Sequence, residues 1–251
     1  MAFRDVLSRD VHSRDARALD DAGDSFFGDF GLSGRVVDDG LPPTEPAPLL
    51  AATPWQFEMG DSGGSLPRRI DTRDPMEPLR FDGMVLRPWH RDDARAMVEA
   101  VRESMGSLGR WMDWCHPGYG VREAIDWADA CADSLAGGQA CEFGLFDERN
   151  GRLVGGAGLN QFNTVHRVCN LGYWVRQSAQ GQGIATRAAR ALAGYGFGAL
   201  GFQRIEIVVA EGNEASLAVA RKLGAQFECL ARNRLVIRGN PVSAWVHSLV
   251  P

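Results

Sequence analysis

The chain has 251 residues, of which 45% are hydrophobic and 24% are charged, the composition of an ordinary globular protein. Its formal net charge is −5, no basic patch favours a nucleic-acid partner, and no apolar run is long enough to cross a membrane. The five cysteines include no Cys-x-x-Cys pair, so we expect free thiols in a reducing cytoplasm rather than disulfides or a metal site.

Residues 1–75 differ in composition from the rest of the chain. They hold 8 arginines against 14 acidic residues, and they include a proline-rich and a Gly/Ser-rich stretch. Such a segment buries too little apolar surface to offset an ordering entropy of about 1–2 kcal/mol per residue. We expect a disordered acidic tail or linker over residues 1–75 and a folded domain over residues 76–251. Two alternatives are a partner anchor at Phe26, Phe27 and Phe30, and a true translation start at Met76.

The first half of the expected domain contains one strand and two helices. Apolar spacing predicts a strand at 84–87, a helix at 91–105 and a helix at 121–135 that ends before Gly137 and Gly138. An aromatic-rich stretch at 108–114 separates the two helices.

The second half alternates strands with helices. A hairpin of strands at 142–147 and 153–159 turns at Asn150-Gly151, because this pair tolerates positive φ. The pattern then predicts further strands beginning near Cys169 and at 203–209, 227–230, 235–237 and 242–249, with helices at 184–200 and 214–223. Helices between strands, with hairpins at both ends, predict an α+β fold with a mixed central sheet.

The stretch over residues 170–186 organises this domain. An apolar strand leads into a loop that contains Gly181 and Gly183, and a helix follows. The glycines leave main-chain N–H groups uncovered at the helix start, where the helix dipole is positive, so the loop is suited to a pyrophosphate. No P-loop lysine follows Gly183, and a dinucleotide-binding fingerprint would need glycine where Thr186 stands, so neither of these motifs applies.

The loop matches a third motif. Gln180, Gly183 and Ala185 fit the Gln/Arg-x-x-Gly-x-Gly/Ala loop of GNAT acetyltransferases, and the preceding strand reads NLGYWV. With the segments at 204–209, 213–216 and 221–224, roughly residues 79–251 resemble the RimJ/RimL-like branch of that family. The resemblance implies a GNAT fold, in which flanking helices cover a mixed sheet and the strand before the loop splays from the next strand. The arm of acetyl-CoA then lies in the gap.

The resemblance also implies a cofactor site. The residues expected to bind acetyl-CoA are Tyr173, Trp174, Val175, Gln180, Gly181, Gln182, Gly183, Ile184, Ala185, Thr186, Asn213 and Ser216. Asn213 is equally suited to cap its helix. Ser216 is either the proton donor to the leaving thiolate or plain helix surface, because the tyrosine that many relatives use is replaced by Ala220.

On the acceptor side, the candidate substrate residues are Trp111, Trp114, Asn160 and Asn170. The two tryptophans are equally suited to wedge the core.

The general base remains open at this level. Many relatives carry glutamate where this chain has Asn170, which cannot accept a proton usefully. The alternatives are Glu142, Glu206, His166, or a water chain held by Asn160 and Asn163. We select Glu206 with Ser216 as the catalytic residues, although Glu206 is also suited to pair structurally with an arginine.

The sequence therefore predicts an N-acetyltransferase that uses acetyl-CoA as co-substrate and no metal. The acceptor is an amine that attacks directly in a ternary complex, either a protein N-terminus, an amino acid or another small amine. No nucleic-acid or membrane partner is expected, and the protein is a monomer or a homodimer. The alternative is a non-catalytic acyl-CoA-binding or sensing module, which Asn170 and Ala220 keep open.

Overall fold

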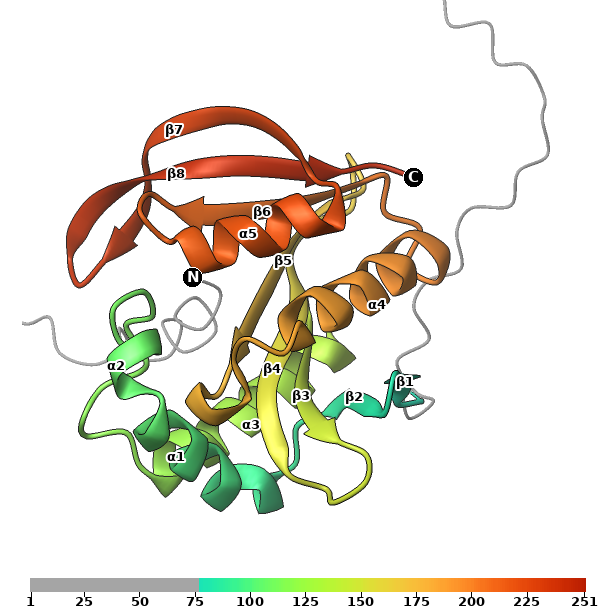
Figure 1. Cartoon of the computed structure of the whole chain (residues 1–251). Helices are drawn as coiled ribbons and strands as arrows, with labels where there is room; N and C mark the ends of the chain where they lie inside the picture. Colours follow the sequence, from blue (N-terminus) through green and yellow to red (C-terminus); the bar gives the residue numbers. More distant parts are fainter. Residues whose placement is uncertain (1–76) are drawn as a thin grey trace, which may run out of the picture. The chain divides into compact units, whose positions relative to one another are not determined.

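The computed structural model describes residues 77–251, so the expectations for residues 1–75, including Phe26, Phe27 and Phe30, lie outside the described residues. The described strands form one sheet of eight in the order β1-β2-β3-β4-β5-β6-β8-β7 (Figure 1). Their bounds are Leu79–Phe81 (β1), Met84–Pro88 (β2), Cys141–Asp147 (β3), Leu153–Asn163 (β4), Val168–Val175 (β5), Arg204–Ala210 (β6), Gln226–Ile237 (β7) and Asn240–Leu249 (β8).

All neighbouring strands in this sheet are antiparallel except β5 and β6, which run parallel. The helices are Ala94–Glu103 (α1), Met105–Leu108 (α2), Val121–Ala136 (α3), Ile184–Gly198 (α4) and Glu214–Leu223 (α5). The predicted α+β class with a mixed central sheet is confirmed.

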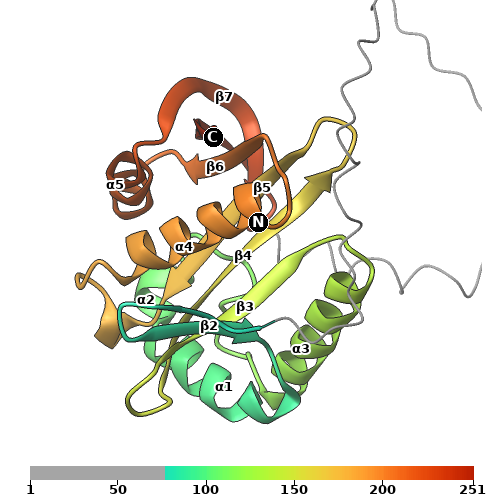
Figure 2. The same cartoon turned by 90° about the vertical axis from the view of Figure 1, so that its right-hand side faces the viewer.

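Helices cover both faces of the sheet. Figure 2 shows α1 and α3 on one face and α4 on the other. Residues of α4 and α5 share one apolar core, and residues of α1 and α3 share a second, tryptophan-rich core. Successive side chains of a strand point to opposite faces, so in β5 Leu171 and Val175 enter the first core while Trp174 enters the second. This explains why apolar residues of β5 occur at both odd and even positions.

The helix predicted at 91–105 is interrupted in the structure. A 3-10 turn at Arg91–Asp93 precedes α1, which ends at Glu103, and the short α2 follows. Ser104, at the break, is buried. Its hydroxyl donates to the Ala100 carbonyl (2.6 Å) and accepts from the N–H of Gln177 (2.9 Å). Hydrogen bonds of a serine side chain to the main chain compete with the hydrogen bonds of a continuing helix. This competition accounts for the break between α1 and α2.

The strands predicted at 227–230 and 235–237 form one strand, β7, interrupted by a bulge around Asn233, whose φ is +51°. Polar residues at 232–234 obscure this continuity in the sequence. Two other ends also differ, because β4 continues to Asn163 and α4 stops at Gly198.

Candidate functional site

The loop between β5 and α4 has the geometry of an anion site. Gly181 and Gly183 have φ of +75° and +72°, and Gly183 is the N-cap of α4. A Cβ at either glycine would meet no atom within 4 Å, so the surface above the loop is open. The first N–H groups of a helix have no acceptor within the helix and attract anions. Arg187 adds a guanidinium in the first turn; it is half-buried, and its Nε has no acceptor in the part of the chain that the structure describes.

An ion-pair network around one buried arginine holds this loop against α1. Arg176, which directly follows β5, is only 2% exposed. Its guanidinium donates to Glu103 (3.0 Å), to Glu99 (2.8 Å) and to the Leu153 carbonyl (3.0 Å). The hydrogen bond from Arg176 lowers the pKa of Glu103 to about 2. Glu103 also accepts the N–H of Ser178 (2.6 Å), so the same carboxylate anchors the loop backbone.

Gln180 contributes to this anchoring with its side chain. Its side-chain amide donates to the Val175 carbonyl (2.9 Å) and to the Ser107 hydroxyl (3.1 Å). Both hydrogen bonds are within the protein, so this amide stabilises the loop. Trp174, Val175 and Ile184 are buried in the cores. These three residues were expected at the cofactor, and their placement leaves only main-chain atoms for such a contact.

Strands β5 and β6 diverge as the GNAT fold requires. They pair over three positions, from Val168 opposite Arg204 to Asn170 opposite Glu206, and then separate. The space beyond is a cavity of about 290 Å³, which we call the cleft. Its walls come from β5, β6, the start of α5, the stretch 111–114 and the end of β7.

Two hydroxyl groups meet in the cleft. The Tyr173 hydroxyl lies 3.0 Å from the Ser216 hydroxyl and 3.1 Å from the Ser216 carbonyl. Burial raises the pKa of Tyr173 to about 12, although the hydrogen bond with Ser216 opposes the rise. Asn213 caps α5 by accepting the N–H of Ser216 (3.2 Å), which confirms its capping role and fixes Ser216 in the cleft wall. Ala220 is fully buried in the core.

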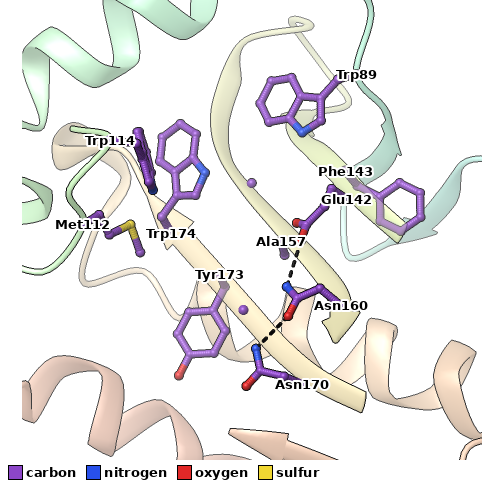
Figure 3. A pocket seen from close by; sticks show the side chains of 12 residues that line it. Trp89, Met112, Trp114, Glu142, Phe143, Ala157, Asn160, Asn170, Tyr173 and Trp174 are labelled. Atoms are coloured by element: carbon purple, nitrogen blue, oxygen red, sulfur yellow. Dashed lines mark hydrogen bonds between the residues drawn. The ribbon is translucent and has the colours of Figure 1, made fainter. Parts of the chain in front are cut away.

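A smaller cavity of about 50 Å³ adjoins the cleft, and we call it the carboxyl pocket because Glu142 lines it. Both cavities are lined by Met112, Trp114, Asn170, Gly172 and Tyr173. Figure 3 shows a chain of hydrogen bonds through the carboxyl pocket. Asn170 donates to the Asn160 carbonyl oxygen (3.0 Å), and Asn160 donates to Glu142 (2.8 Å). The amides thus hold the carboxyl beside the cleft.

The Glu142 carboxyl has a pKa close to neutral pH. Desolvation raises its pKa to about 7, against the hydrogen bond from Asn160, which lowers it. The space for this carboxyl exists because the opposite residue on β4 is Gly158, where a Cβ would lie 2.0 Å from Glu142 Oε2. Gly156 similarly makes room for Trp174, whose Nε1 would lie 2.6 Å from a Cβ there. The glycine-rich run at 155–158 was the signal in the sequence for this pocket, and its role is visible only in the sheet.

The other candidate bases lie away from the lining of both cavities. Glu206 sits beside Asn170 in the sheet but pairs with Arg204 (3.0 Å), and it lines neither cavity. His166 is exposed in the turn between β4 and β5, where its N–H donates to Asn163 Oδ1 (2.9 Å). Asn163, the last residue of β4, therefore holds the turn that follows, while Asn160 belongs to the carboxyl pocket.

The two tryptophans expected at the substrate both line the cleft. Trp114 also packs edge-on against Trp174, with ring centroids 5.6 Å apart, so it lines the cleft and wedges the core at once. Trp111 packs against a small cluster formed by Ala210, Leu235 and Ala244.

Within residues 77–251, no group of three or more His, Cys, Asp or Glu side chains is placed to hold a metal. No described helix is both long enough and apolar enough to span a membrane.

The splayed strands and the glycine loop are those of an acetyltransferase. Residues 84–226 match the family described as the acetyltransferase (GNAT) domain, and the chain belongs to this family. YdaF of Bacillus subtilis (strain 168), provisionally named a ribosomal N-acetyltransferase, is 33% identical over 152 residues, which are 59% of this chain and 80% of YdaF.

Solved structures agree with this assignment. A Vibrio cholerae protein, provisionally described as a ribosomal-protein-serine acetyltransferase, is 32% identical with a TM-score of 0.65, covering 70% of this chain and 99% of that one. A RimL ribosomal L7/L12 α-N-protein acetyltransferase bound to coenzyme A shares the fold with a TM-score of 0.64 at 21% identity, covering 69% of this chain and 98% of that one. The resemblance to the RimJ/RimL type is confirmed.

Proposed function

We propose that the protein transfers the acetyl group of acetyl-CoA to a primary amine. The observation that carries the proposal is the cleft between β5 and β6, because β5 both lines it and ends at the anion loop. A long ligand with phosphates at one end can lie on the loop and extend its reactive end along β5.

The phosphates would bind the main-chain N–H groups of residues 181–185, with Arg187 as a further cation. Pairing between β5 and β6 stops at Asn170, so beyond it no strand among the described residues pairs with the β6 side of β5. An N–H there is suited to polarise a thioester carbonyl. The relatives named for ribosomal-protein acetylation support a protein N-terminus as one acceptor, and amino acids and other small amines are the alternatives.

The proposed reaction uses Glu142 as the base in place of Glu206. The ammonium group of the acceptor loses a proton to Glu142, directly or through water in the carboxyl pocket, which is large enough for water. The neutral amine attacks the thioester carbonyl, the new C–N bond forms, and the C–S bond breaks. The leaving thiolate takes a proton from the Ser216 and Tyr173 hydroxyl pair. The nitrogen, which carries an extra proton after the attack, returns one to this pair as it becomes the amide nitrogen, and the amide product leaves. A base whose pKa is near 7 suits this role at neutral pH.

The direct test is steady-state thiol release from acetyl-CoA with a panel of peptides, amino acids and small amines. Amine-dependent release that saturates with both substrates is expected. Saturable binding of CoA without turnover of any amine would instead favour the non-catalytic acyl-CoA-binding module. The cytoplasmic location and the monomeric or homodimeric state stay predictions.

A further inference from the structure

Strand β7 departs from regular pairing where it reaches the cleft. Ala231 pairs with Ala244 and Leu235 pairs with Val242, so residues 232–234 stand opposite a single residue of β8. Asn233, in the middle, has a φ of +51°, a left-handed conformation that asparagine tolerates better than most residues. Bulges re-aim the side chains beside them. Here the chain after the bulge, beginning with Arg234, forms a wall of the cleft.

Within the described residues 77–251, Arg234 has no partner, although it is half-buried. Five arginines among residues 77–251 are buried or half-buried: Arg87, Arg176, Arg187, Arg204 and Arg234. Arg87, Arg176 and Arg204 each pair with a carboxylate of the protein. Arg187 adjoins the anion loop. No carboxylate or hydrogen-bond acceptor in residues 77–251 contacts the guanidinium of Arg234.

A guanidinium that has lost part of its water without gaining a partner carries an uncompensated desolvation cost. The other charged residue of the cleft wall is Asp113, which accepts the main-chain N–H of Arg238 (2.7 Å). No ion pair joins Asp113 to Arg234 within residues 77–251. A second cation lies nearby, since the Arg110 guanidinium sits over the ring of Trp111 at 4.9 Å from its centroid. This end of the cleft is therefore suited to an anion supplied by a ligand.

We propose that Arg234 binds a carboxylate of the acceptor, so that the amines acetylated here carry a carboxylate close to the reacting nitrogen. The inference rests on the proposed function and names its substrate class. Arg234 and the Tyr173 and Ser216 hydroxyls line the same cleft of about 290 Å³. One acceptor can thus place its amine at the hydroxyls and its carboxylate at the arginine. The carboxylate is either the α-carboxylate of a free amino acid or an acidic side chain near a peptide N-terminus.

Paired acceptors that differ only in this charge test the proposal. Thiol release is measured with alanine and alaninamide, and with the peptide amides Ala-Asp-Gly-Gly and Ala-Asn-Gly-Gly. In one of the two pairs, the acidic acceptor should have a kcat/KM about 10- to 100-fold higher than its neutral partner, which is the scale of a charge-assisted bidentate hydrogen bond. The pair that shows this preference identifies the source of the carboxylate. In Arg234→Gln the preference should fall below about threefold, because only the acidic member loses a contact.

Arg232→Gln is the matched control. It removes the same charge two residues away, from an exposed side chain that does not line the cleft, and it should keep the wild-type preference. Equal kcat/KM within both pairs for the wild type, or the same loss of preference in Arg232→Gln, would overturn the assignment.

A binding measurement separates this inference from the proposed function. The N-acetylated forms of the four compounds are titrated calorimetrically into the full chain saturated with CoA. If an acidic form binds more tightly than its neutral partner, and Arg234→Gln abolishes this difference, the carboxylate site is supported. That holds even if no amine is turned over, since the lack of turnover counts only against the proposed transferase activity. Equal binding of acidic and neutral forms would overturn the carboxylate site while leaving any measured turnover intact.

Discussion

Replacing Glu142 with glutamine should make the protein more stable and far less active. The substitution keeps the shape of the side chain and an oxygen that can accept the hydrogen bond from Asn160, but it removes the ionisable group. Removal of a base that assists proton transfer usually costs 10²- to 10⁴-fold in rate. We expect a loss of this size in kcat/KM, together with loss of a wild-type rate increase through pH about 7.

The stability effect follows from the pKa of Glu142. The folded protein keeps the Glu142 proton up to pH about 7, whereas the unfolded chain releases it near the ordinary value of 4.5. Between these values the folded state binds more protons, so the wild type loses stability as pH rises from 4.5 to 7. At about 1.4 kcal/mol per pKa unit, the full cost above pH 7 is about 3 kcal/mol.

Glutamine does not ionise and avoids this cost. Glu142→Gln should unfold at a temperature higher by roughly 6–12 °C at pH 8, since 1 kcal/mol shifts the melting temperature of a domain of this size by about 2–4 °C. Near pH 4 the two proteins should melt at similar temperatures. Thermal melts at both pH values, alongside thiol-release kinetics from pH 5.5 to 9, measure both effects on the same samples.

The comparison variant is Glu206→Gln, which changes the rival carboxylate. It breaks the ion pair with Arg204, so a stability loss of up to about 1 kcal/mol is expected, with activity within a few-fold of the wild type. An active Glu142→Gln protein beside an inactive Glu206→Gln protein would show that Glu206 is the base. A Glu142→Gln protein that is less stable than the wild type at pH 8 would refute the desolvation argument.

Three further predictions concern the loop, the hydroxyl pair and the domain boundary. Gly183→Val should weaken acetyl-CoA binding strongly in calorimetry, because valine strains a φ of +72° and covers the open surface of the loop; Gly194→Ala, in the exposed middle of α4, should bind normally. Ser216→Ala should lower kcat by roughly 10²-fold with little change in the KM for acetyl-CoA, and a change confined to KM would make Ser216 a binding residue only. A chain starting at Met76 should melt at the same temperature and turn over acceptors as fast as the full chain; a melting temperature several degrees lower would show that residues 1–75 pack on the domain.

Much of the fold was predictable because its signals are local. The capping residues Asn213 and Gly224 bound α5 where the sequence predicts it, and Gly181 and Gly183 mark the loop before α4. Helix caps and tight loops depend on a few neighbouring residues, and Gly181, Gly183 and Gly224 stand at positions with positive φ, which glycine adopts readily. Spacing alone also indicated that β5 is buried on both faces. The break at Ser104 was not visible, because one of the two hydrogen bonds that the serine makes there is to Gln177, 73 residues away.

The chemistry of the site was less predictable, because it depends on atoms that the fold brings together from distant positions. Glu142 owes its pKa to desolvation in a pocket that Gly158 keeps open on the neighbouring strand. Tyr173 meets the Ser216 hydroxyl across 43 residues of sequence. The carboxyl group is the same in Glu142 and Glu206, so the sequence by itself could name both as candidates. Only the tertiary structure distinguishes them, because it places the half-buried Glu142 in the carboxyl pocket beside the cleft and pairs Glu206 with Arg204.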